Sequence, residues 1–123
     1  MKQKGVLIVD DARFVRNKLK QIIEKIPSAK VIGEASNGEE AVSLYIDLRP
    51  DLVTMDLVMP NIDGIKAIEE IIKYDNNAKI LVVSAMGQEA SILEVTEKGA
   101  KDFIKKPFKD DQVSKVIERL LRN

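Results

Sequence analysis

The nine residues LVTMDLVMP at positions 52–60 decide how the rest of the chain is organised. The first four are apolar apart from one threonine and follow Pro50, which predicts a short buried strand. Asp56 ends that strand, and Pro60 with Gly64 indicates a loop after it. A carboxylate at the carboxyl end of a buried parallel strand lies where open α/β sheets bind their ligands. One such aspartate alone is better explained as a turn residue, so its meaning depends on the other strand ends.

The composition is that of one ordinary globular domain and excludes several kinds of site. The 123 residues are 45% hydrophobic, and 20 basic side chains balance 20 acidic ones, so no basic field is available to bind nucleic acid directly. Cysteine and histidine are absent, which excludes disulfides, thiolate chemistry and histidine bases. Any metal must therefore be a hard cation such as Mg²⁺, Mn²⁺ or Ca²⁺. The sequence has no signal segment or membrane-spanning apolar stretch, and we expect a cytoplasmic protein that does not bind membranes.

Apolar strands and amphipathic helices alternate five times along the chain. The predicted strands lie at 5–9, 30–35, 52–55, 79–83 and 102–104. The predicted helices lie at 13–26, from Asn37 onward, after Gly64, at 88–98 and at the C-terminus. Asn37 and Glu40 have the spacing of a capping box, and Gly99 is placed as a helix stop. The helix that Asn37 opens is expected to bury Ala41, Leu44, Tyr45 and Leu48.

This alternation predicts an α/β fold with a parallel sheet that is buried on both faces by helices. Right-handed crossovers leave two ways to wind five such units, the flavodoxin-like strand order 2-1-3-4-5 and half of a Rossmann fold. The second requires a glycine-rich turn after the first strand, where this chain has the glycine-free segment 10–13. No linker or repeat divides the chain, so we expect one doubly wound domain over residues 1–123 with no output domain.

Polar side chains occur at the carboxyl ends of four of the five strands, which share one edge of a parallel sheet. They are Asp10 and Asp11 after the first strand, Asp56 after the third, Ser84 at the end of the fourth and Lys106 after the fifth. Three carboxylates in one crevice repel each other unless a hard cation lies between them. A hydroxyl and an ammonium facing that cation indicate an anionic ligand, for which phosphate is the natural candidate.

Four short motifs resemble the receiver domain of two-component response regulators, and in particular its single-domain chemotaxis regulators. They are VDD at 9–11, MDLVMP at 55–60 with DG at 63–64, SA at 84–85 and KPF at 106–108. The resemblance covers nearly the whole chain and implies the flavodoxin-like order 2-1-3-4-5. It also implies that Asp56 accepts a phosphoryl group from a phosphohistidine on a partner histidine kinase, in a reaction that depends on Mg²⁺.

The same resemblance assigns the ligands of the cation. Asp11 and Asp56 would bind Mg²⁺, or Mn²⁺, directly, together with the backbone carbonyl of Val58. Asp10 would act through a water molecule. This set suits the chemistry, because a carboxylate nucleophile facing an anionic donor needs its charge neutralised.

The phosphoryl group would be held and sensed by residues on the other strands. Lys106 would pair with the phosphoryl oxygens, and Ser84 with the backbone N–H of Ala85 would close on the attached group. Phe103 would then swing into the space that Ser84 vacates, although ordinary core packing explains Phe103 almost equally well. For Lys106 to leave a short strand and point back at the acidic cluster, the chain must reverse sharply, and we predict a cis peptide bond before Pro107.

Output would come from a protein-binding surface, which in the family that the chain resembles usually consists of the fourth helix, the fifth strand and the last helix. Ile92, Val95 and Phe103 are candidates for it, with Leu93 expected in the core, while Val95 is more simply explained as a core residue too. The expected downstream partner is a protein such as a flagellar motor switch protein. We expect a monomer that is not an enzyme, although it assists its own phosphorylation and dephosphorylation.

Two other functions fit parts of the pattern. One is a stand-alone phosphorelay intermediate, or the receiver fragment of a DNA-binding regulator, which differs from a chemotaxis regulator only in its partner. The other is a Mg²⁺-dependent aspartyl phosphatase. That chemistry commonly requires a second acid two residues after the nucleophile, where this chain has Val58, which cannot protonate a leaving group.

Overall fold

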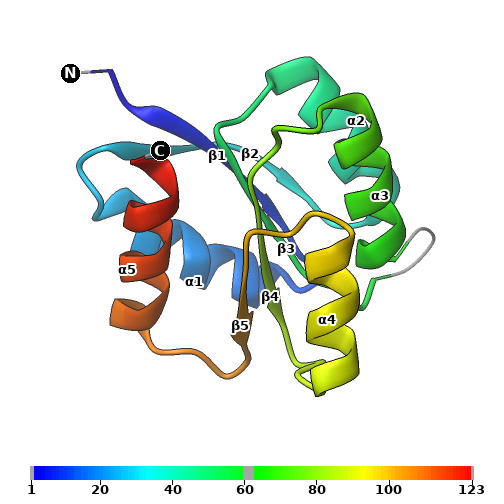
Figure 1. The fold of residues 1–123 in the computed structure, drawn as a ribbon. Coiled ribbons are helices and arrows are strands. Elements are labelled where there is room, and N and C mark those ends of the chain that lie inside the picture. Colours follow the sequence, from blue (N-terminus) through cyan, green and yellow to red (C-terminus); the bar gives the residue numbers. More distant parts are fainter. Residues whose placement is uncertain (1, 60–62, 123) are drawn as a thin grey trace.

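The computed structural model, which describes residues 2–59 and 63–122, is built around five parallel strands in the order β2-β1-β3-β4-β5 (Figure 1). This confirms the predicted fold class and strand order. The strands are β1 (Lys4–Val9), β2 (Ala29–Ala35), β3 (Leu52–Met55), β4 (Ile80–Ser84) and β5 (Asp102–Lys105). The helices are α1 (Arg13–Glu24), α2 (Gly38–Leu48), α3 (Gly64–Tyr74), α4 (Glu89–Glu97) and α5 (Asp110–Leu121). Pro60, which with Gly64 indicated the loop after β3, lies outside the described residues.

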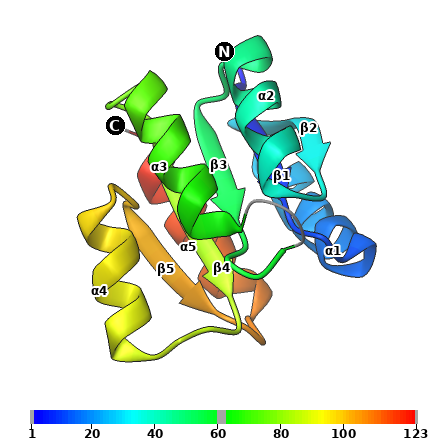
Figure 2. The ribbon, with the colours of Figure 1, turned by 90° about the vertical axis from the view of Figure 1, so that its right-hand side faces the viewer.

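Helices cover both faces of the sheet. α1 and α5 lie on one face, and α2, α3 and α4 lie on the other (Figures 1 and 2). Each face has its own hydrophobic cluster, because successive strand residues point to opposite sides. In β3, for example, Leu52 packs into the cluster under α1 and α5, whereas Val53 and Met55 pack into the other. This arrangement explains why the central strands are apolar at nearly every position.

The predicted start of α2 and end of α4 are confirmed, with one difference in detail. The Asn37 side chain accepts a hydrogen bond from the Glu40 N–H (2.8 Å), as an N-cap residue does. The Glu40 carboxylate, however, accepts hydrogen bonds from the N–H and hydroxyl of Ser36 rather than from the backbone of Asn37. Gly99 follows α4 with a φ of 116°, a conformation that glycine adopts without strain.

Two residues expected in the core are exposed. Leu48 is 38% exposed, and its end lies over Gly33 at the margin of α2. Leu93 is 56% exposed, while its neighbour Val95 is fully buried, as the core interpretation of Val95 required. The apolar residues of α4 lie on two sides of a short helix, so their spacing did not show which side contacts the sheet. Val95 therefore cannot contribute to a partner surface in this conformation, and Ile92, at 37% exposed, remains the candidate.

The carboxyl ends of β1, β3, β4 and β5 meet at one edge of the sheet, and the loop after β5 turns back toward that edge. The Lys106 N–H donates to the Ser84 carbonyl oxygen (2.9 Å), which extends the β4–β5 pairing to the first residue of the loop. The peptide bond between Lys106 and Pro107 is cis, as predicted. Within the described part of the chain, no helix has the length and apolar character needed to cross a membrane.

Replacement of Thr54 by valine should stabilise the protein. Thr54 is fully buried in β3, and its hydroxyl has no hydrogen-bond partner among the described residues. Because an unsatisfied buried hydroxyl is costly, we expect Thr54→Val to raise the free energy of unfolding by about 1–3 kcal/mol in urea titrations. Thr96→Val is the control, since the Thr96 hydroxyl is exposed and donates to the Ile92 carbonyl oxygen. Equal effects of the two changes would show that the Thr54 hydroxyl carries no penalty.

Candidate functional site

Asp56 lies at the centre of the edge where the strands end, directly after β3. Its N–H donates to the Val9 carbonyl oxygen (3.0 Å), which holds it between β1 and β4. The residue is 5% exposed. One carboxylate oxygen, Oδ1, accepts a hydrogen bond from the Val58 N–H (3.3 Å), and Oδ2 lies 3.2 Å from Lys106 Nζ. The carboxylate is thus fixed in orientation but keeps lone pairs that can bind a further group.

Asp10 is the other buried carboxylate of the site. Its Oδ1 accepts a hydrogen bond from the Ala12 N–H (2.9 Å), and its Oδ2 lies 2.7 Å from Lys106 Nζ. Burial raises the pKa of Asp10 above its ordinary value of 3.8, although the contacts with Lys106 and Ala12 oppose that shift. For Lys106, burial lowers the pKa, but the hydrogen bonds and charges of Asp10 and Asp56 outweigh burial and raise it. Lys106 is therefore a firmly charged cation between two carboxylates.

The third carboxylate, Asp11, is exposed and completes an acidic cluster. Asp10, Asp11 and Asp56 each offer one oxygen, and these oxygens lie within 4.8 Å of one another. A cluster of carboxylate oxygens at this spacing is a donor set that suits a hard divalent cation. The residues present therefore fit the Mg²⁺ or Mn²⁺ that the sequence predicted. Val58 lies in the loop beside the cluster, and the role of its carbonyl remains a prediction.

Ser84 is the last residue of β4, which lies beside β3 in the sheet, and Ala85 follows it. Ser84 is fully buried, and its hydroxyl oxygen accepts a hydrogen bond from the Met86 N–H (3.3 Å). Ala85 is exposed. Phe103 pairs with Val82 in the β4–β5 register and packs partly buried against the cluster under α4. Because Ser84 is two residues beyond Val82, Ser84 and Phe103 face the same side of the sheet, as a coupling between them requires.

Three residues at this edge were assigned no contact with the site by the sequence analysis. Arg16 donates from Nη1 to the Asp10 carbonyl oxygen (2.7 Å) and places Nε 3.1 Å from Glu34, so it ties the end of β1 to β2. A charged residue on an amphipathic helix carries no sequence signal for such a contact. Phe14 is an exposed aromatic that falls outside the apolar spacing of α1, which was an available signal. Gly64 packs against the backbone of Asp56, a contact that only the tertiary structure reveals.

Neutralising Asp10 should stabilise the protein at neutral pH. The pKa of Asp10 is higher in the folded protein than in the unfolded chain, so folding favours the protonated carboxyl group. The stability that this provides is present below the unfolded-chain pKa and is lost as the pH rises through the folded-state pKa. We expect Asp10→Asn to raise the free energy of unfolding at pH 7 and to remove this part of the pH dependence. The measurement is urea unfolding from pH 3 upward without divalent cations. Asp47→Asn, a change at an exposed position of α2, is the control, and a loss of stability in Asp10→Asn would refute the expectation.

Comparisons with known proteins identify this arrangement. Residues 6–118 match the family described as response regulator receiver domain. The chemotaxis protein CheY of Thermotoga maritima is 58% identical over 117 residues, which are 95% of this chain and 94% of that protein. The CheY of the CheX–CheY–BeF3–Mg²⁺ complex from Borrelia burgdorferi is a structural neighbour with a TM-score of 0.89 and 37% identity, covering 98% of this chain and 89% of that one. The response regulator domain of Thermotoga maritima CheB has a TM-score of 0.88 and 39% identity, and the match covers 98% of this chain and 95% of that one.

The chain therefore belongs to the response regulator receiver domain family, as its motifs predicted. Members of this kind are signalling proteins. More specifically, the similarity over nearly the full length of chemotaxis proteins makes it a response regulator in chemotaxis signalling.

Proposed function

We propose that Asp56 is the phosphoacceptor of this response regulator and that it receives the phosphoryl group from a phosphohistidine of a histidine kinase. One observation carries the proposal. Asp56 is a buried carboxylate that has Lys106 Nζ at 3.2 Å from one oxygen and the carboxylates of Asp10 and Asp11 beside it. A cation and a metal-binding cluster around one fixed carboxylate are what phosphoryl transfer to an aspartate requires.

Each residue of the site has a defined task in this proposal. Asp11, Asp56 and the Val58 carbonyl would hold Mg²⁺ directly, and Asp10 would do so through water. When bound, the cation neutralises the charge of the carboxylates and of the incoming phosphoryl group. Lys106 exchanges its contact with Asp56 for the phosphoryl oxygens and keeps the added charge compensated.

The product is sensed by the end of β4. Phosphorylation adds negative charge where one carboxylate stood, which attracts the Ser84 hydroxyl and the Ala85 N–H as hydrogen-bond donors. The inward movement of Ser84 leaves room for Phe103 on the same side of the sheet. The change reaches the surface of α4, β5 and α5, where Ile92 is exposed. We propose a flagellar motor switch protein as the partner of this surface. In this proposal the response regulator itself is a cytoplasmic monomer. It accepts a phosphoryl group and is not an enzyme that turns over a separate substrate.

The proposal is supported by a neighbour of known structure, whose CheY is found with BeF3, Mg²⁺ and the protein CheX. The experiment that tests it locates the phosphoryl group. The protein is incubated with a phosphohistidine kinase, ATP and Mg²⁺ and then reduced with borohydride, which converts an aspartyl phosphate to homoserine. We expect homoserine at position 56 in the peptide spectrum. Homoserine at another aspartate, or at none, would overturn the proposal.

Removal of the metal should abolish the reaction. We expect labelling to stop in a chelator and to return with Mg²⁺ or Mn²⁺, because the three carboxylates and the donor otherwise repel each other. Asp11→Asn should weaken Mn²⁺ binding in a calorimetric titration more than Asp10→Asn does, since Asp11 is the expected direct ligand. Unchanged Mn²⁺ affinity in Asp11→Asn would contradict its role, whatever the labelling shows.

A further inference from the structure

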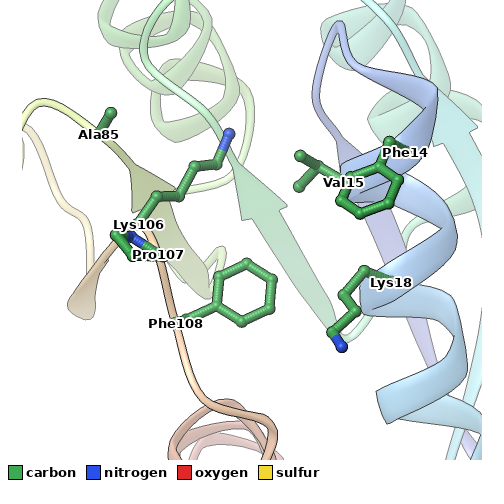
Figure 3. A pocket seen from close by; sticks show the side chains of 7 residues that line it. All are labelled: Phe14, Val15, Lys18, Ala85, Lys106, Pro107 and Phe108. Atoms are coloured by element: carbon green, nitrogen blue, oxygen red, sulfur yellow. The ribbon is translucent and has the colours of Figure 1, made fainter.

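A pocket of about 500 Å³ lies beside the acidic cluster, between α1 and the segment that joins β5 to α5 (Figure 3). One wall comes from α1 and the other from Lys106 and the two residues after it. The pocket is lined by Phe14, Val15, Lys18, Ala85, Lys106, Pro107 and Phe108. Figure 3 shows the rings of Phe14 and Phe108 on opposite sides of the pocket. The Lys106 side chain is extended, with its terminal nitrogen far from the backbone.

The pocket and the proposed phosphoacceptor site share a residue. Lys106 lines the pocket, and its Nζ lies 3.2 Å from Asp56 Oδ2. Ala85, whose N–H was assigned to the phosphoryl group, lines the pocket as well. A group bonded to a phosphorus atom at Asp56 is therefore within reach of the pocket.

The chemistry of the walls indicates what the pocket can hold. Phe14 is 81% exposed, so its phenyl ring is free to pack against a ligand. The walls carry two ammonium groups, those of Lys18 and Lys106. Lys18 also forms an exposed ion pair, with its Nζ 3.5 Å from Asp110 Oδ1. Among the described residues that line the pocket, none carries a carboxylate. Aromatic walls and positive charge suit a ligand that combines a flat apolar ring with negative charge.

On the basis of the proposed function, we propose that this pocket is a subsite for the aromatic group of a phosphoryl donor. The aromatic ring of the donor's leaving group packs between Phe14 and Phe108, while the phosphoryl group faces Asp56. A small aromatic acyl phosphate such as benzoyl phosphate meets both requirements. Acetyl phosphate has the same reacting group but only a methyl in place of the ring.

The reaction with such a donor needs no further reagent. An oxygen of the Asp56 carboxylate forms a bond to phosphorus while the bond from phosphorus to the acyl oxygen breaks. The electron pair of the broken bond remains on the released benzoate. Nothing is oxidised or reduced, and no proton is transferred.

The test compares the two donors on the full chain in the presence of Mg²⁺. We expect kcat/KM for phosphorylation of Asp56 to be about tenfold higher with benzoyl phosphate than with acetyl phosphate, the gain expected when part of a phenyl ring is buried. Phe14→Ala should reduce that ratio toward one, and Phe14→Leu should restore part of it. Leu93→Ala removes another exposed apolar side chain, on α4 and outside the pocket, and should keep the full ratio.

A second measurement does not depend on phosphoryl transfer. Phenylphosphonate should shift the amide resonances of Phe14, Val15 and Phe108 in NMR spectra at concentrations where methylphosphonate does not. Equal kcat/KM for the two acyl phosphates, with labelling at Asp56 intact, would overturn the subsite and leave the proposed function standing. Absence of labelling with either acyl phosphate would overturn the subsite, and absence of labelling by the kinase as well would overturn both. If Phe14→Ala slows transfer from the kinase but leaves the donor ratio unchanged, the pocket binds a partner protein, and the subsite is refuted.

Discussion

Asp56→Asn is expected to abolish acid-labile phosphorylation by both a histidine kinase and a small phosphodonor. The amide nitrogen and oxygen of asparagine cannot form an acyl phosphate, and the remaining carboxylates do not share the surroundings of Asp56. Asp11 is exposed, and Asp10 is already held by Lys106 at 2.7 Å and by the Ala12 N–H. The expected loss is complete within detection, measured as acid-labile label per mole of protein.

The matched control for this change is Asp63→Asn. Asp63 is exposed and caps α3 by accepting a hydrogen bond from the Lys66 N–H (2.9 Å), a task that asparagine performs equally well. The Asp63→Asn variant should retain full labelling at Asp56. Circular dichroism would show that both variants are folded. Undiminished labelling of Asp56→Asn would refute the assignment of the phosphoacceptor.

Gly64→Ala is expected to disrupt the same site through the backbone. A Cβ at position 64 would lie 2.1 Å from the Asp56 carbonyl oxygen and 2.6 Å from Leu57 Cα. Both are main-chain atoms, so no change of rotamer relieves the contact, and either α3 or the end of β3 must move. We expect a loss of about 3 kcal/mol in the free energy of unfolding, at the upper end of the usual cost of overpacking. Because the Gly64 N–H also donates to Leu57 O (3.0 Å), the shift should lower the affinity for Mn²⁺ too.

Gly87→Ala tests whether the cost arises from backbone contact rather than from the added methyl group. The three atoms nearest to a Cβ at Gly87 would all belong to the side chain of Lys105, the first of them 2.5 Å away. Lys105 is exposed and flexible, so it can move aside. Gly87→Ala should therefore change the free energy of unfolding in urea only slightly. If the two glycine variants lose equal stability, the close approach of α3 to Asp56 is not the cause.

The sequence by itself determined the fold class and the identity of the candidate site residues. Both follow from features that are local in the chain. Apolar runs flanked by helix signals predict parallel strands, and all parallel strands of one sheet end at the same edge. The sequence therefore predicts that Asp10, Asp56, Ser84 and Lys106 lie at one edge. Ion pairs join Lys106 to both carboxylates, and the Lys106 N–H donates to the Ser84 carbonyl oxygen.

The tertiary structure alone decided which side of each helix contacts the sheet and where backbones approach closely. Leu93 is exposed and Val95 buried because α4 lies at the β5 edge of the sheet, where only one side of the helix has strands to cover. The Thr54 hydroxyl, which has no partner within residues 2–59 and 63–122, and the contact between Gly64 and Asp56 both depend on neighbours that the local sequence does not specify. The pocket at Phe14 likewise joins α1 to residues about ninety positions later. Such features arise from packing between elements, which the periodicity of any one element does not specify.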